Sequence, residues 1–243
     1  MARAPLLDGL DELRAQMPLA EVMRLIEHTA RWVDPATFRL LPLWYPEYAR
    51  KQHFYKENWT KPQLNKGTHK QEGNLGGNRA LTLALGLRSA ERPNWSCCHI
   101  WGVDDLSYQE ANLVVQDRRF FSCIGNMVLL PTPLKAFTDA MQDVKTMLRI
   151  CARALYGWHC DHDCMVAALE MVERWNDWAA YPSSWPRTPR DEKLPLGMVE
   201  LTDEIRRDAQ RRLARIKSDL DTAGEYYPRD KVREALAYWH IEV

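Results

Sequence analysis

The spacing of apolar residues predicts helices in the first third of the chain and throughout its second half. Before residue 92, one helical face ends near Val33, and a shorter helix over 79–85 is closed by Gly86. After residue 140, two further apolar faces repeat every three or four positions. Their members are Val144, Met147, Cys151 and Leu155 in the first, and Met165, Leu169, Val172 and Trp175 in the second. The pattern therefore predicts a mainly α protein.

The clearest helical stripe lies near the C-terminus. It consists of Met198, Leu201, Ile205, Ala209, Leu213, Ile216, Leu220 and Ala223. Gly224 then stands where a left-handed C-terminal cap is expected. A stripe of this kind suits either the protein core or the seam of a dimer. Four prolines between residues 181 and 195 exclude a continuous helix there and predict a connector before the stripe.

The middle of the chain has a different pattern. Short β-branched and aromatic runs, CCHIW from Cys97 and FFSCIGNMVLLP from Phe120, predict strands. Residues 51–77 contain four glycines, three aromatic residues and regularly placed lysines, which is typical of a loop or an irregular strand. A small β element is therefore expected between the helical regions.

Composition and charge narrow the class of protein. The 243 residues are 46% hydrophobic, and 33 Lys and Arg balance 33 Asp and Glu, which indicates a globular protein and excludes a simple polycation. No apolar run approaches the roughly 18 residues of a membrane span, and the N-terminus becomes acidic too early for a signal peptide. We therefore expect a cytoplasmic protein without a membrane partner, whose six cysteines are reduced thiols.

A histidine and an asparagine mark the mid-chain strands as the chemically distinctive part. His99 lies in the first run, Asn126 opens N-M-V-L-L 27 positions later, and Lys135 follows after nine more. This pattern resembles the HNH family of the His-Me finger (ββα-metal) endonucleases, over about residues 95–142. The resemblance implies a mainly α fold with a small central ββα-metal (HNH) hairpin-plus-helix core. It divides the chain into an N-terminal helical region with a basic loop (1–92), the nuclease core (93–158) and a C-terminal helical region (159–243).

The resemblance also implies a function and roles for three residues. The function is metal-dependent hydrolysis of DNA phosphodiester bonds, which in this family commonly serves restriction, phage defence or mobile elements. His99 becomes the general base, Asn126 the group that orients it, and Lys135 a phosphate contact or a substitute for the third signature residue. A neutral imidazole suits proton removal from water because its ordinary pKa is near 6.5. The competing interpretations are a buried core histidine for His99 and a solvated helix residue for Lys135.

The metal ligands are less clear from the pattern, because Cys98 stands where many family members have an aspartate. The expected cofactor is a divalent ion, Mg²⁺ or Mn²⁺ first and Zn²⁺ second, since a thiolate favours zinc. The candidate ligands are Asp139, Asp104, Asp105 and Cys98. Asp139 or Thr138 is alternatively the cap of the next helix. The cluster His159–Cys164 suits a weak zinc site or, in preference, a loop in which Asp161 or Asp163 caps a helix.

Local charge makes DNA the expected partner and RNA the second choice. The segment from Arg50 to Arg92 contains nine basic residues and three acidic ones. The candidate nucleic-acid contacts are Lys51, Lys56, Lys61, Lys66, Lys70 and Arg79. The interleaved Phe54, Tyr55 and Trp59 suit base stacking or anchorage of the segment. A homodimer through the long C-terminal helix is a further expectation, because cutting both strands usually takes two copies of a small site.

One alternative function fits the same residues. The aspartate missing before His99 and the lysine at the third signature position also suit a ββα scaffold that has lost activity. The chain would then be a non-catalytic DNA- or protein-binding module.

Overall fold

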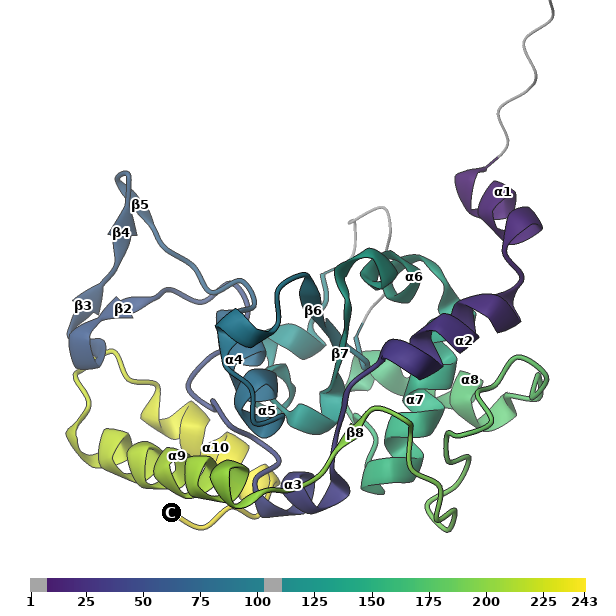
Figure 1. Cartoon of the computed structure of the whole chain (residues 1–243). Coiled ribbons are helices and arrows are strands. Elements are labelled where there is room, and N and C mark those ends of the chain that lie inside the picture. Colours follow the sequence, from purple (N-terminus) through teal and green to yellow (C-terminus); the bar gives the residue numbers. More distant parts are fainter. Residues whose placement is uncertain (1–7, 103–110) are drawn as a thin grey trace, which may run out of the picture.

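The computed structural model describes residues 8–102 and 111–243 (Figure 1). The chain folds mainly into helices, as the apolar spacing predicts. The α-helices are α1 (Gly9–Gln16), α2 (Leu19–Thr29), α3 (Pro35–Leu40), α4 (Leu75–Ala84), α5 (Arg118–Phe121), α6 (Lys135–Ala140), α7 (Gln142–Tyr156), α8 (Val166–Arg174), α9 (Asp203–Thr222) and α10 (Arg229–Tyr238). The strands form small two-stranded sheets: β1 (Trp32–Val33) with β8 (Met198–Val199), β2 (Tyr55–Lys56) with β3 (Lys61–Pro62), β4 (Leu64–Asn65) with β5 (Thr68–His69), and β6 (Trp95–His99) with β7 (Met127–Pro131).

The strands predicted in the middle of the chain are β6 and β7, which pair antiparallel. Their register places Trp95 opposite Pro131 and His99 opposite Met127. The second strand is shorter than predicted, because residues 118–126 form α5 and a 3₁₀ turn instead. The carboxylate of Asp117 accepts a hydrogen bond from the backbone N–H of Arg119 and so starts a helical turn where the apolar run suggested a strand.

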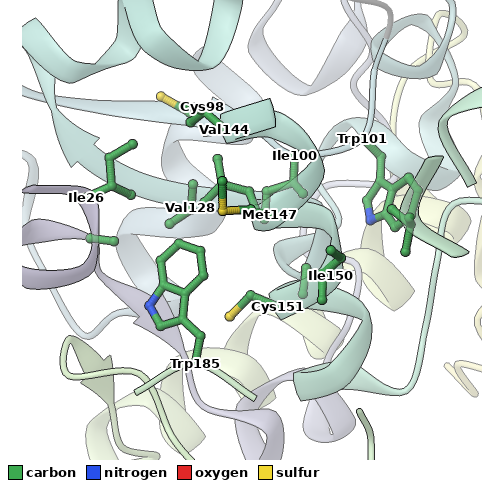
Figure 2. Packing of buried hydrophobic residues seen from close by; sticks show 14 of the residues in the cluster. Ile26, Cys98, Ile100, Trp101, Val128, Val144, Met147, Ile150, Cys151 and Trp185 are labelled. Carbon is green, nitrogen blue, oxygen red and sulfur yellow. The ribbon is translucent and has the colours of Figure 1, made fainter. Parts of the chain in front are cut away.

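The β6–β7 hairpin lies at the centre of the core because both of its faces are covered. Alternate side chains of a strand point to opposite faces, so Cys98 and Val128 face α7 while Cys97 and Leu129 belong to a second cluster that includes residues of α4. Figure 2 shows Val128 close to Met147 of α7 and to Trp185. Trp185 comes from the proline-rich connector predicted over 181–195, which has neither helix nor strand. The first cluster thus draws on residues from the beginning, middle and late part of the chain.

The apolar stripe of α9 belongs to the core. Ile205, Ala209, Ile216 and Leu220 are buried, and α9 packs against α3 and α4. Of the two interpretations of this stripe, core and dimer seam, the structure selects the core.

Gly224 does not take the left-handed cap conformation that the sequence predicts. Helix α9 ends at Thr222, with Ala223 as its C-cap. Of the two glycines, Gly86 has the predicted positive φ and Gly224 does not. Gly224 instead donates its backbone N–H to the carbonyl of Asn58 at 2.7 Å. A β-carbon at residue 224 would lie 2.5 Å from the carbonyl oxygen of Trp59. The glycine is needed for a close backbone approach and not for its φ angle.

Residues 52–72 form a ribbon of short strands that extends away from the helical body (Figure 1). This is the segment predicted as loop or irregular strand. Its base is fixed by aromatic rings: Tyr55 stacks on Tyr226 at 4.9 Å, and Trp59 meets Tyr227 edge-on at 5.3 Å. The ribbon is therefore anchored to the segment between α9 and α10.

Two further expectations bear on the environment of the chain. Within residues 8–102 and 111–243, no helix combines the length and the apolar character that a membrane crossing requires. All six cysteines carry free thiols, as expected.

The contact of Gly224 with the ribbon base gives a testable prediction. Gly224→Ala is expected to lower the free energy of unfolding by about 1–3 kcal/mol, because the added methyl group would overlap the Trp59 carbonyl. Urea denaturation measures this change. Gly9→Ala is the matched control, since a β-carbon at residue 9 meets no atom within 4 Å. Equal stability of the two variants would contradict the contact.

Candidate active site

His99 ends strand β6, and its ring is held by the chain that leads into β7. Its Nε2 lies 2.9 Å from the carbonyl oxygen of Phe121, and its ring lies parallel to the Phe121 ring at 5.9 Å. A carbonyl oxygen only accepts hydrogen bonds, so Nε2 carries the proton. Nδ1 is then the unprotonated nitrogen, and it has no hydrogen-bond partner among the residues that the structure describes. The imidazole is fixed in the tautomer that can accept a proton at Nδ1.

The surroundings of His99 keep this imidazole neutral. Burial lowers its pKa to about 4, although the hydrogen bond to the Phe121 carbonyl acts in the opposite direction. The positive charges of Arg50, Lys145 and Lys135 lower the pKa further. The ring can therefore accept a proton throughout the neutral pH range.

Asn126 holds the two backbone segments that meet at His99. Its side chain is fully buried, and its Oδ1 accepts a hydrogen bond of 2.6 Å from the backbone N–H of Trp101. Its Nδ2 donates to the carbonyl of Phe120 at 3.2 Å. Neither hydrogen bond involves the imidazole. The amide fixes Phe120, and the next residue, Phe121, provides the carbonyl that binds the ring. Asn126 therefore ties the backbone that follows His99 to the backbone that precedes Phe121.

Helix α4 begins directly beside the imidazole. A β-carbon at Gly77 would lie 3.3 Å from the Phe121 carbonyl oxygen and 3.6 Å from Cε1 of His99, so only a small residue leaves the ring in place. The helix starts at Leu75, four residues before the predicted start at Arg79, because the buried carboxylate of Glu72 accepts hydrogen bonds from the N–H groups of Leu75 and Gly76.

A set of cationic side chains surrounds this end of the hairpin. Arg50 is held by Asn74 at 2.5 Å, and Arg92 by Asn78 at 3.2 Å. Lys145 is buried on α7 and donates to the carbonyl of Thr138 at 3.3 Å. Sequence reasoning counted the two arginines only as part of a basic stretch and missed the lysine. A charged residue inside the apolar face of α7 was the signal that could have identified it.

Lys135 and Asp139 lie one turn apart on α6, as the predicted helix requires. Their side chains form an exposed ion pair of 3.6 Å. The interpretation of Thr138 or Asp139 as a helix cap is wrong, because α7 begins at Gln142 after Met141, and the Thr138 hydroxyl donates to the carbonyl of Lys135. Lys135 is close enough to lower the pKa of His99.

The predicted metal ligands are not brought together in the described residues. Cys98 is buried in the apolar cluster of Figure 2, and as the neighbour of His99 on strand β6 it points to the opposite face of the hairpin. Burial raises the pKa of its thiol to about 11. Asp139 pairs with Lys135, and Asp104 and Asp105 lie outside the described residues. Residues 8–102 and 111–243 contain no group of three or more His, Cys, Asp or Glu side chains arranged to hold a metal ion. The described side chains therefore do not form a site for a divalent ion by themselves.

The His159–Cys164 segment is a loop between α7 and α8. His162, and neither Asp161 nor Asp163, caps the short turn before α8, because its Nδ1 accepts from the backbone N–H of Cys164 at 3.2 Å. Asp161 instead accepts a hydrogen bond from the hydroxyl of Tyr238 at 2.8 Å.

The six predicted nucleic-acid contacts are all exposed. Five lie on or next to the ribbon and one lies on α4: Lys51, Lys56, Lys61, Lys66, Lys70 and Arg79. The aromatic residues between them anchor the ribbon, since Phe54 is buried and Trp59 packs on Tyr48 at 5.5 Å. The ribbon therefore presents lysines to solvent on an aromatic base.

Comparison with known proteins adds no relative: no family model, curated protein or solved structure matches this chain.

Proposed function

We propose that this protein is an HNH-type endonuclease that hydrolyses DNA phosphodiester bonds with His99 as the general base. The observation that carries the proposal is the state of His99: a neutral imidazole of fixed tautomer, at the end of an antiparallel hairpin, among cationic side chains. Asn126 directly precedes the second strand, and the helix that carries Lys135 follows that strand, in the order that the family resemblance implies.

The chemistry of phosphodiester hydrolysis explains why these groups suit it. A water molecule at Nδ1 of His99 would lose its proton to the ring as its oxygen bonds to phosphorus, while the P–O bond to the leaving 3′ oxygen breaks and that oxygen takes up a proton from solvent. The phosphate would gain charge in the transition state, and Arg50 and Lys135 supply positive charge on this side of the hairpin. The family resemblance also implies a divalent cation, Mg²⁺ or Mn²⁺ before Zn²⁺, and the metal dependence of cleavage tests that part of the proposal.

The substrate is proposed to be DNA because of the ribbon. A two-stranded ribbon fits the major groove of B-DNA, and its exposed lysines can neutralise phosphates on either side. The local concentration of these lysines explains how a chain of zero net charge would bind a polyanion.

Cleavage of supercoiled plasmid, in separate reactions with Mg²⁺, Mn²⁺ and Zn²⁺, tests the proposal. Nicking that requires one of these ions and disappears in His99→Ala is the expected result. RNA in the same assay distinguishes the second substrate class. DNA binding without cleavage under any of the ions would support the non-catalytic binding module instead. Cleavage that persists in His99→Ala would exclude His99 as the general base.

The ribbon lysines give a separate prediction. Replacing Lys61 and Lys66 with glutamine should weaken DNA binding and reduce the slope of log affinity against log salt by about 1.8, because each lost phosphate contact removes about 0.9 from that slope. Fluorescence anisotropy of a labelled duplex at several salt concentrations measures the slope. The double variant Lys193→Gln with Lys231→Gln, exposed elsewhere, is the control. An unchanged slope in the ribbon variant would exclude the ribbon from the interface.

A further inference from the structure

A cavity of about 300 Å³ opens where the ribbon base meets α4 and α9, apart from the His99 site. Aromatic rings form one part of its wall: Trp59 lies 5.5 Å from Tyr48 and 5.3 Å from Tyr55. Asn58 and Trp59 reach the cavity from consecutive left-handed backbone conformations, with φ of 47° and 63°. Such conformations are costly outside glycine, and they persist here because Gly224 binds the Asn58 carbonyl. An aromatic wall of this kind suits a planar ligand with a π face.

The charges that line the cavity leave one cation without a counter-ion. Glu47 forms an ion pair with Arg212, and Asp219 pairs with Arg215 at 2.9 Å. Within the part of the chain that the structure describes, Arg79 has no carboxylate at ion-pair distance, and its guanidinium instead lies 5.4 Å from the Tyr45 ring. The exposed Arg79 is therefore available to a ligand anion such as a phosphate group.

The cavity is close to the proposed catalytic base. A β-carbon at Gly76 of α4 would lie 3.0 Å from both Cβ of Tyr48, which lines the cavity, and Cε1 of Phe121, whose ring lies against His99. Only the start of α4 separates the two sites, and a helix with its side chains is about 10 Å wide. One nucleic-acid strand can therefore contact both.

We propose that this cavity binds one nucleotide of the substrate strand, with its base against Trp59 and a phosphate at Arg79. This inference rests on the proposed nuclease function, because the bound nucleotide would belong to the DNA substrate. An extruded nucleotide would hold the strand in place while a neighbouring phosphate reaches His99.

Calorimetric titration of the full chain with single nucleotides tests the cavity without cleavage. We expect dCMP to bind, because it carries both a planar base for the Trp59 wall and a phosphate for Arg79. Deoxycytidine and inorganic phosphate should each bind more weakly than dCMP. Arg79→Gln should lower the affinity for dCMP about tenfold. Arg233→Gln, an exposed arginine on α10, is the matched control and should leave binding unchanged.

A second measurement distinguishes a strand from a free nucleotide. Unlabelled dCMP should displace a labelled single-stranded oligonucleotide from the wild type, and Arg79→Gln should weaken oligonucleotide binding. Nucleotide binding without displacement would assign the cavity to a free nucleotide and overturn the strand assignment. No binding of any nucleotide, or equal binding by wild type and Arg79→Gln, would overturn the site itself. None of these readouts depends on cleavage, so failure of the nuclease proposal is recognised separately in the plasmid assay.

Discussion

Replacing His99 with alanine is expected to slow single-turnover DNA cleavage by about 10²–10⁴-fold, the contribution that a positioned general base makes. The reason is that Nδ1 of His99 is the proton acceptor that the fixed tautomer leaves open, while Nε2 is engaged by the Phe121 carbonyl. The rate is measured on supercoiled plasmid with enzyme in excess, at the metal concentration that supports wild-type cleavage.

Two controls separate the loss of chemistry from loss of fold or of substrate binding. His28→Ala changes an exposed histidine on α2 and should cleave like the wild type. His99→Ala should bind the same duplex with an affinity close to that of the wild type, because the ribbon lysines are unchanged. A His99→Ala enzyme that cleaves within a few-fold of the His28→Ala enzyme would remove His99 from the mechanism.

Replacing Asn126 with alanine is expected to lower the free energy of unfolding by about 2–4 kcal/mol. The substitution leaves the Trp101 N–H and the Phe120 carbonyl without their side-chain partner, and each buried group without a partner costs about 1–3 kcal/mol. Urea denaturation followed by circular dichroism measures the change.

Asn126→Asp sharpens this prediction. A carboxylate can still accept from the Trp101 N–H but cannot donate to the Phe120 carbonyl, and it adds a charge to a fully buried position. It should therefore also destabilise the fold. Asn176→Ala, at an exposed residue after α8, is the control and should change stability little. An Asn126→Ala protein as stable as this control would contradict the tie between the two backbone segments.

Periodicity was enough to predict the elements whose side chains meet a continuous apolar surface. The helical faces of α7, α8 and α9 follow from spacing, because the core selects one side of each element. The runs CCHIW and FFSCIGNMVLLP located the two strands but not their bounds, since β6 spans Trp95–His99 and β7 spans Met127–Pro131. The hydrogen bonds around His99 could not be predicted in the same way. The imidazole is held by the backbone carbonyl of Phe121, which any residue type at that position would provide.

Backbone contacts between distant segments account for the other differences. Gly76 and Gly77 indicated a loop by composition, yet they form the first turn of α4, because Glu72 caps its N–H groups and Tyr48 and Phe121 approach closely. Gly224 indicated a helix cap, yet its role depends on Asn58, far away in the sequence. Each of these positions is set by a partner that local sequence does not identify.

The acid side of the pH profile of single-turnover DNA cleavage tests the central claim, a neutral His99 acting as general base, most directly. Because burial lowers the pKa of His99 to about 4, the base form persists below the ordinary histidine value near 6.5. The wild-type rate should therefore change by less than about threefold between pH 7.5 and pH 5.5. A fall of about tenfold per pH unit below pH 6.5, or no cleavage at any pH, would contradict the account.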